Sequence, residues 1–249
     1  CHVASSYLLQ GLNVLYITLE MAEERIAERI DANLLDVTME DLHDMPQQLY
    51  DGKIKKLREK TQGQLIIKEY PTASAHSGHF KSLINELALK KSFKPDVIFI
   101  DYLNICASAR FKGGNISSYF YIKAIAEELR GLAVEANVPI FSATQTTRTG
   151  YVSTDLGLED TSESFGLPAT ADFMFALMSN EELEQLGQMK VKQLKNRYND
   201  PSVNRAFIIG VDRAKMRLYD VQQSSQNIVD SGQVEEKEDA YNKFSDFKL

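Results

Sequence analysis

Short apolar runs alternate with longer amphipathic stretches over the first 145 residues. The apolar runs, rich in β-branched and aromatic residues, cover 13–19, 64–70, 96–103 and 138–145. Stretches in which apolar residues recur every three or four positions cover 1–10, 22–35, 80–93 and 117–137. Short apolar strands alternating with amphipathic helices predict an α/β fold with a mainly parallel sheet and helices on both faces.

The pattern changes after a long polar segment. Four strand-like segments follow it, at 172–178, 189–198, 204–212 and 216–223, with a short helix near 180–186. These segments predict antiparallel strands that finish the sheet. We find no internal repeat and no linker, and therefore expect residues 1–222 to form one domain.

The last part of the chain, 223–249, is acidic and rich in Gln, Ser and Asn, with little periodicity. Such a composition is typical of a disordered tail. The alternative is a docking peptide that ends in "FSDFKL".

Charge and cysteine content narrow the function classes. A net charge of -7 argues against a protein that coats nucleic acid over a broad surface, but it is compatible with a narrow basic channel. The two cysteines, Cys1 and Cys106, cannot build a disulfide framework. The sequence has no membrane-spanning run and no secretory signal, so we expect a cytoplasmic protein without a membrane partner.

Polar side chains follow several apolar strands where an apolar sheet would not require them. Since ligands of parallel sheets collect at the carboxyl ends of strands, these positions are the candidate site. They are Glu20 after "LYITL", Asp101 after "VIFI", Gln145 after "IFSAT", and Lys195 with Arg197 in "LKNRY".

Each position has a chemical and a structural interpretation. Asp101 suits a Mg²⁺-bound nucleotide or a turn, and Glu20 suits a general base or the start of a helix. Gln145 could hydrogen-bond a water and a phosphate oxygen, or only close its strand. Lys195 and Arg197 project to the same face of one strand, where they need an anion between them or surrounding water.

The order and spacing of five motifs resemble one family, the replicative hexameric DNA helicases of the DnaB type, and most of all its T-even bacteriophage members. The likeness extends over about residues 1–220. The motifs are "TLEMAEERIAERI", "DVIFIDYLNI", "SATQTTR", "ESFGLPATADFMFAL" and "LKNRYND".

The resemblance implies a RecA-like P-loop NTPase core that uses ATP and Mg²⁺. It implies that Glu20 is the general base, that Asp101 holds Mg²⁺ through its water shell, and that Gln145 reports the phosphate state. Lys195 and Arg197 would then stabilise γ-phosphate charge in a neighbouring subunit, which implies a homo-hexamer. The expected activity is translocation on single-stranded DNA and duplex unwinding, with primase and a helicase loader or other replication proteins as partners.

Two loops are candidates for contact with single-stranded DNA. The first, "SARFKGGNISS", combines cations with glycines, and the second begins at "TRTG". Ordinary surface loops are the alternative for both. The candidate residues are Arg110, Lys112, Gly113, Gly114 and Arg148, of which the last is also a candidate nucleotide contact.

The family's phosphate-binding loop, Gly-x-x-x-x-Gly-Lys-Ser/Thr, would precede Cys1, and no Gly-Lys-Ser or Gly-Lys-Thr occurs in these 249 residues. We therefore expect a fragment that lacks the first strand and this loop and that is inactive by itself. Two alternatives remain at this point: a recombinase-type ATPase of the same superfamily, and a non-catalytic module that binds replication proteins.

Overall fold

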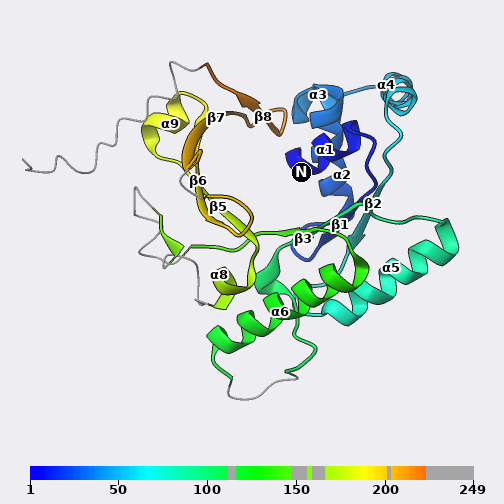
Figure 1. Ribbon diagram of the computed structural model, residues 1–249. Helices are drawn as coiled ribbons and strands as arrows, with labels where there is room; N and C mark the ends of the chain where they lie inside the picture. The colour runs from blue at the N-terminus through cyan, green and yellow to red at the C-terminus, as the bar shows by residue number, and fades with distance from the viewer. Residues whose placement is uncertain (112–115, 147–155, 159–165, 201–202, 223–249) are drawn as a thin grey trace, which may run out of the picture.

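The computed structural model describes residues 1–111, 116–146, 156–158, 166–200 and 203–222 (Figure 1). Its strands form two four-stranded sheets. The parallel sheet has the order β2-β1-β3-β4, with β1 at Val14–Thr18, β2 at Leu65–Glu69, β3 at Val97–Asp101 and β4 at Ile140–Ser142. The antiparallel sheet has the order β5-β6-β7-β8, with β5 at Phe173–Met178, β6 at Gln188–Asn196, β7 at Ala206–Asp212 and β8 at Arg217–Asp220.

Helices make the crossovers of the parallel sheet. Those in the first part of the chain are α1 (His2–Leu9), α2 (Glu23–Leu35), α3 (Met39–His43), α4 (Gln47–Lys60) and α5 (Ser77–Lys91). The 3-10 helix η1 (Leu103–Ile105), α6 (Ser118–Ala136), α8 (Gly166–Thr170) and α9 (Glu181–Gln185) follow. None of the helices in the described ranges is long and apolar enough to cross a membrane.

Alternating residues of the central strand β1 build a core on each face of the parallel sheet. Leu15 and Ile17 pack with side chains of α5 and α6, among them Phe80 and Leu129. Val14 and Tyr16 belong to the opposite core, with side chains of α1 and α2. Figure 1 shows these two helix pairs on opposite sides of the sheet. The expected α/β sheet covered on both faces is confirmed.

The prediction that the antiparallel strands finish the parallel sheet is wrong, because they pair only with one another in the described residues and form a second sheet. This sheet contacts the first part of the fold through the turn between β7 and β8. The Met39 amide donates to the Ala214 carbonyl over 2.8 Å, and Lys215 and Arg217 both bind Asp36, 3.1 Å and 2.9 Å away. Asp36 caps the end of α2. This hairpin therefore fixes the antiparallel sheet against α2.

The sequence pattern did not predict helices α3 and α4. Neither helix has a buried residue. Helix α3 is only five residues long, and α4 carries three half-buried apolar residues at helical spacing, Tyr50, Ile54 and Leu57, among mostly polar residues. The expected tail, 223–249, lies outside the described residues.

Candidate functional site

The strand register places the first candidate residues at one edge of the parallel sheet. Thr18, the last residue of β1, lies opposite Asp101, the last residue of β3. The Leu19 amide donates to the Asp101 carbonyl over 2.9 Å and continues the ladder past the end of β1. Glu20 and Asp101 therefore leave the sheet at neighbouring positions on the same edge.

A buried tyrosine fixes the Asp101 carboxylate. The Tyr16 hydroxyl donates to Asp101 Oδ2 over 2.8 Å, and the Tyr16 side chain is buried under the sheet. Burial, with a further contribution from the Asp101 charge, raises the pKa of Tyr16, so the phenol remains a proton donor. Cys1, just before α1, packs against the core that contains Tyr16.

Gln145 lies beside the segment that follows Asp101. Its Nε2 donates to the Tyr102 hydroxyl over 3.2 Å, and Tyr102 follows Asp101 through a cis peptide bond. The Leu103 amide also donates to the Ala143 carbonyl over 3.3 Å. These two hydrogen bonds hold the segment after β4, which contains Gln145, against the segment after β3.

Glu20 is exposed on a short turn between β1 and α2. The buried Thr18 hydroxyl closes this turn, since it accepts from the Met21 amide over 3.1 Å and donates to the Met21 carbonyl over 2.8 Å. Helix α2 begins at Glu23, so Glu20 lies before its first turn. The interpretation of Glu20 as a residue that starts this helix is wrong, and its carboxylate is presented from a fixed turn.

Lys195 and Arg197 form a second cluster, with the end of α8. Lys195 Nζ donates to the Pro168 and Ala169 carbonyls, and Arg197 Nη2 donates to the Ala169 carbonyl over 2.6 Å. Unpaired carbonyls at a helix end attract cations. Burial, followed by the positive charge of Arg197, lowers the pKa of Lys195.

Asp172 supplies an anion for this cluster, in direct contact with two arginines and within electrostatic reach of Lys195. Its Oδ1 lies 3.1 Å from Arg197 Nη1 and 3.0 Å from Nη2 of Arg130, a residue of α6. The sequence analysis included Asp172 only as part of a motif, and it did not predict a role for Arg130. Among the described residues, no hydrogen bond or ion pair joins this cluster to Glu20, Asp101 or Gln145.

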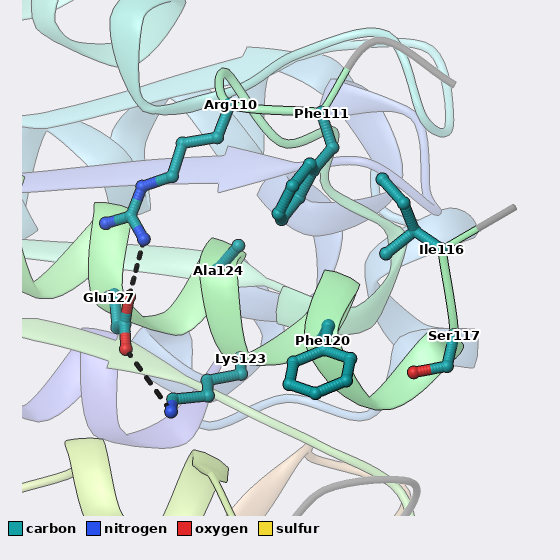
Figure 2. A pocket seen from close by; sticks show the side chains of 8 residues that line it. All are labelled: Arg110, Phe111, Ile116, Ser117, Phe120, Lys123, Ala124 and Glu127. Carbon is teal, nitrogen blue, oxygen red and sulfur yellow. Dashed lines mark hydrogen bonds and ion pairs between the residues drawn. The ribbon is translucent and has the colours of Figure 1, made fainter. Parts of the chain in front are cut away.

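The described part of the first DNA-loop candidate lies against α6 (Figure 2). Arg110 Nη1 is 2.5 Å from Glu127 Oε2, and Lys123 Nζ is 3.9 Å from Glu127 Oε1. A cavity of about 580 Å³ lies against α6, with Phe111 and Phe120 among its lining residues. The remaining DNA-contact candidates, Lys112, Gly113, Gly114 and Arg148, lie outside the described residues.

Known proteins resemble the chain in sequence and in fold. Residues 1–215 match the family model of the DnaB-like helicase C terminal domain. The chain is 47% identical over 228 residues to the DnaB-like replicative helicase of Enterobacteria phage T4, a match that covers 90% of the chain and 48% of that protein. It is 34% identical over 144 residues to the probable plasmid replicative DNA helicase of Chlamydia trachomatis, covering 56% of the chain and 30% of that protein.

Solved structures share the fold at low sequence identity. A DnaB-like replicative helicase, studied with its interactions with primase, superposes with a TM-score of 0.71 at 17% identity, covering 89% of this chain and 53% of that one. A solved ATPase domain superposes with a TM-score of 0.71 at 18% identity, covering 88% of this chain and 78% of that one. The expected RecA-like fold is confirmed.

The chain spans about half or less of the length of the curated relatives that it matches. The family model nonetheless covers every described candidate residue, from Glu20 to Arg197. The chain therefore belongs to the DnaB-like helicase C-terminal domain family, as the five sequence motifs indicate.

Proposed function

We propose that this chain is the motor domain of a replicative DNA helicase, which couples ATP hydrolysis to translocation along single-stranded DNA and to duplex unwinding. The observation that carries the proposal is the meeting of Glu20, Asp101 and Gln145 at one edge of the parallel sheet. The family membership favours this function over the recombinase-type and non-catalytic alternatives.

Asp101 is the residue that would hold Mg²⁺ through its water shell. A carboxylate in one fixed orientation suits this ion, which keeps most of its waters and needs one or two protein carboxylates. Tyr16 provides that orientation by donating to Oδ2. When bound, Mg²⁺ would neutralise charge on the β- and γ-phosphates of ATP.

Glu20 would act on the water that attacks the γ-phosphate. An exposed carboxylate on a fixed turn can accept a proton or orient the water by hydrogen bonding. Gln145, joined to Tyr102, would transmit the phosphate state to the loop that follows Asp101.

Lys195 and Arg197 would stabilise the γ-phosphate charge of ATP bound to a neighbouring subunit, in a homo-hexamer. Two features support this role. The cluster is separate from Asp101 within the described part of the chain, and there the Arg197 guanidinium pairs with one carboxylate, Asp172. To reach a phosphate, Arg197 must exchange the Asp172 carboxylate for phosphate oxygens.

The DNA contacts are proposed for Arg110, Lys112, Gly113 and Gly114 in the first loop, and for Arg148 in the second. Cations and glycine amides suit sequence-independent binding of a phosphate backbone. Arg148 is also proposed as a nucleotide contact. We further propose that primase and a helicase loader or other replication proteins are partners, in the cytoplasm of the host cell.

A strand-separation assay tests the proposed function. The full-length protein is incubated with a forked DNA duplex, and release of the displaced strand is followed with ATP and Mg²⁺, with a non-hydrolysable ATP analogue, and without nucleotide. We expect release only with hydrolysable ATP and Mg²⁺. Binding of the fork without any ATP-dependent release would contradict the proposal and favour a non-catalytic module.

A further inference from the structure

Two adjacent carboxylates of α6, Glu127 and Glu128, have different environments. The Glu128 side chain is 7% exposed, and the Glu127 side chain is 37% exposed. Both touch the same short segment, 108–111, which is the first part of the first DNA-loop candidate.

Glu128 is a buried acceptor that joins three parts of the chain. Its Oε1 accepts from the Ser108 hydroxyl over 2.7 Å and from the Arg110 amide over 3.2 Å. Its Oε2 accepts from the Ala109 amide over 2.8 Å and from the Ser77 hydroxyl over 3.3 Å. Burial acts to raise the pKa of Glu128, but these hydrogen bonds outweigh it and the pKa is lowered, so the carboxylate stays charged.

The segment 108–111 has no regular secondary structure, yet each of its four backbone amides has an acceptor. Besides the two amides bound by Glu128, the Ser108 amide donates to the Tyr121 hydroxyl over 3.1 Å, and the Phe111 amide donates to the Ser108 hydroxyl over 3.3 Å. The Ser108 hydroxyl is itself held by Glu128. The conformation of the segment therefore depends on one carboxylate.

Glu127 binds the Arg110 side chain more closely than Glu128 does, since Glu128 Oε1 lies 4.0 Å from Arg110 Nε. Glu127 holds the Arg110 guanidinium at 2.5 Å and lies 3.9 Å from the Lys123 ammonium, as the dashed lines in Figure 2 show. Both cations are about half exposed, and a DNA phosphate would seek the same Arg110 donors. Glu127 therefore competes with DNA for Arg110.

We propose that Glu128 and Glu127 set the affinity of segment 108–111 for single-stranded DNA in opposite directions. Glu128 is a positioning residue that holds the backbone of this segment, and Glu127 is an internal competitor that occupies its cation, Arg110. This inference rests on the proposed function, because it assumes that Arg110 contacts DNA.

The two substitutions are expected to change DNA affinity in opposite directions, which a general charge effect would not do. Removing either carboxylate removes one negative charge near a polyanion, and by charge alone both changes would tighten DNA binding. Removing the Glu128 charge also leaves the Ala109 and Arg110 amides with a poorer acceptor, so segment 108–111 loses its conformation.

The test measures single-stranded DNA binding by the full-length protein at several salt concentrations, with oligothymidine as the probe. For Glu127→Gln we expect affinity to rise about threefold, the size of an exposed ion pair. For Glu128→Gln we expect affinity to fall about tenfold, the cost of a lost charged hydrogen bond. The matched control is Glu135→Gln, an exposed carboxylate further along α6 that pairs with Lys81, for which we expect no change.

Kinetics distinguish positioning from a general structural defect. In DNA-stimulated ATP hydrolysis, Glu128→Gln should raise the DNA concentration that gives half-maximal stimulation, with a similar maximal rate at saturating DNA. Should Glu128→Gln fail to fold, Ser108→Ala removes one of the Glu128 bonds without changing charge and should weaken binding in the same direction.

The Arg110→Ala variant distinguishes failure of the inference about Glu127 and Glu128 from failure of the proposed DNA contact of Arg110. It should weaken binding and reduce the salt dependence by about one counterion. If Arg110→Ala weakens binding while Glu128→Gln tightens it as Glu127→Gln does, or leaves it unchanged, the inference is overturned and the DNA contact stands. If Arg110→Ala has no effect, the proposed role of this loop fails as well.

Discussion

Replacing Arg197 by alanine should lower the rate of ATP hydrolysis by the assembled full-length protein by about 10³-fold, the lower end of the range for an arginine finger. The reason is the placement of the guanidinium. Arg197 follows β6, where the Ala169 carbonyl and the Asp172 carboxylate hold it, outside the cluster that contains Asp101. The measurement is steady-state phosphate release at saturating ATP and DNA.

Arg130 provides the matched control for Arg197. It binds the same carboxylate, 3.0 Å from Asp172 Oδ1, but has no proposed contact with nucleotide. Arg130→Ala should therefore lower the rate by less than about fivefold, the scale of a partly exposed ion pair. Equal losses for the two variants would mean that the charge cluster only stabilises the fold around α8, and the proposed role of Arg197 would be rejected.

Replacing Glu20 by glutamine should lower hydrolysis by about 10²- to 10³-fold while ATP binding persists, because the amide keeps the size of the side chain but cannot accept a proton. The turn closed by Thr18 fixes the backbone at Glu20, two residues beyond the point where Thr18 lies opposite Asp101. The measurement pairs phosphate release with equilibrium binding of a fluorescent ATP analogue.

Glu24 is the matched control for Glu20. It is also exposed, four residues further along the chain, in the first turn of α2. Glu24→Gln should leave the hydrolysis rate within about twofold of the wild-type rate, as a surface charge change does. A Glu20→Gln protein as active as the Glu24→Gln protein would rule out the proposed general base.

Mixing the two inactive variants tests whether the site is shared between subunits. In an equal random mixture, about a quarter of the interfaces join an intact Glu20 to an intact Arg197 of the next subunit, so partial activity should return. No recovery above the sum of the separate variants would place both residues in the site of one subunit.

The sequence predicted the strands and the edge of the parallel sheet at which the candidate site lies. Apolar β-rich runs interrupted by a polar residue at their ends mark Glu20, Asp101 and Gln145, because a buried strand has no structural need for such groups. Helix α4 was not predicted, although Tyr50, Ile54 and Leu57 recur at helical spacing, because polar residues dominate this segment and none of its residues is buried.

Partners that act across long sequence separations could not be predicted. In the sequence, Tyr16 is indistinguishable from a core aromatic residue. Only the strand register shows that its hydroxyl reaches Asp101, 85 residues away. Glu128 resembles a solvent-facing helix residue, and only the packing of α6 against segment 108–111 buries its carboxylate among amide donors. Asp172 gains its role in the same way, from two arginines on separate elements.

The dependence of ATP hydrolysis on single-stranded DNA tests the proposed motor function most directly. Phosphate release by the full-length protein is measured with Mg²⁺ and saturating ATP while oligothymidine is added. We expect the rate to rise to a plateau, with Arg110→Ala needing more DNA for half-maximal stimulation than the wild-type protein. A rate that stays unchanged at every DNA concentration would contradict a motor that moves on DNA.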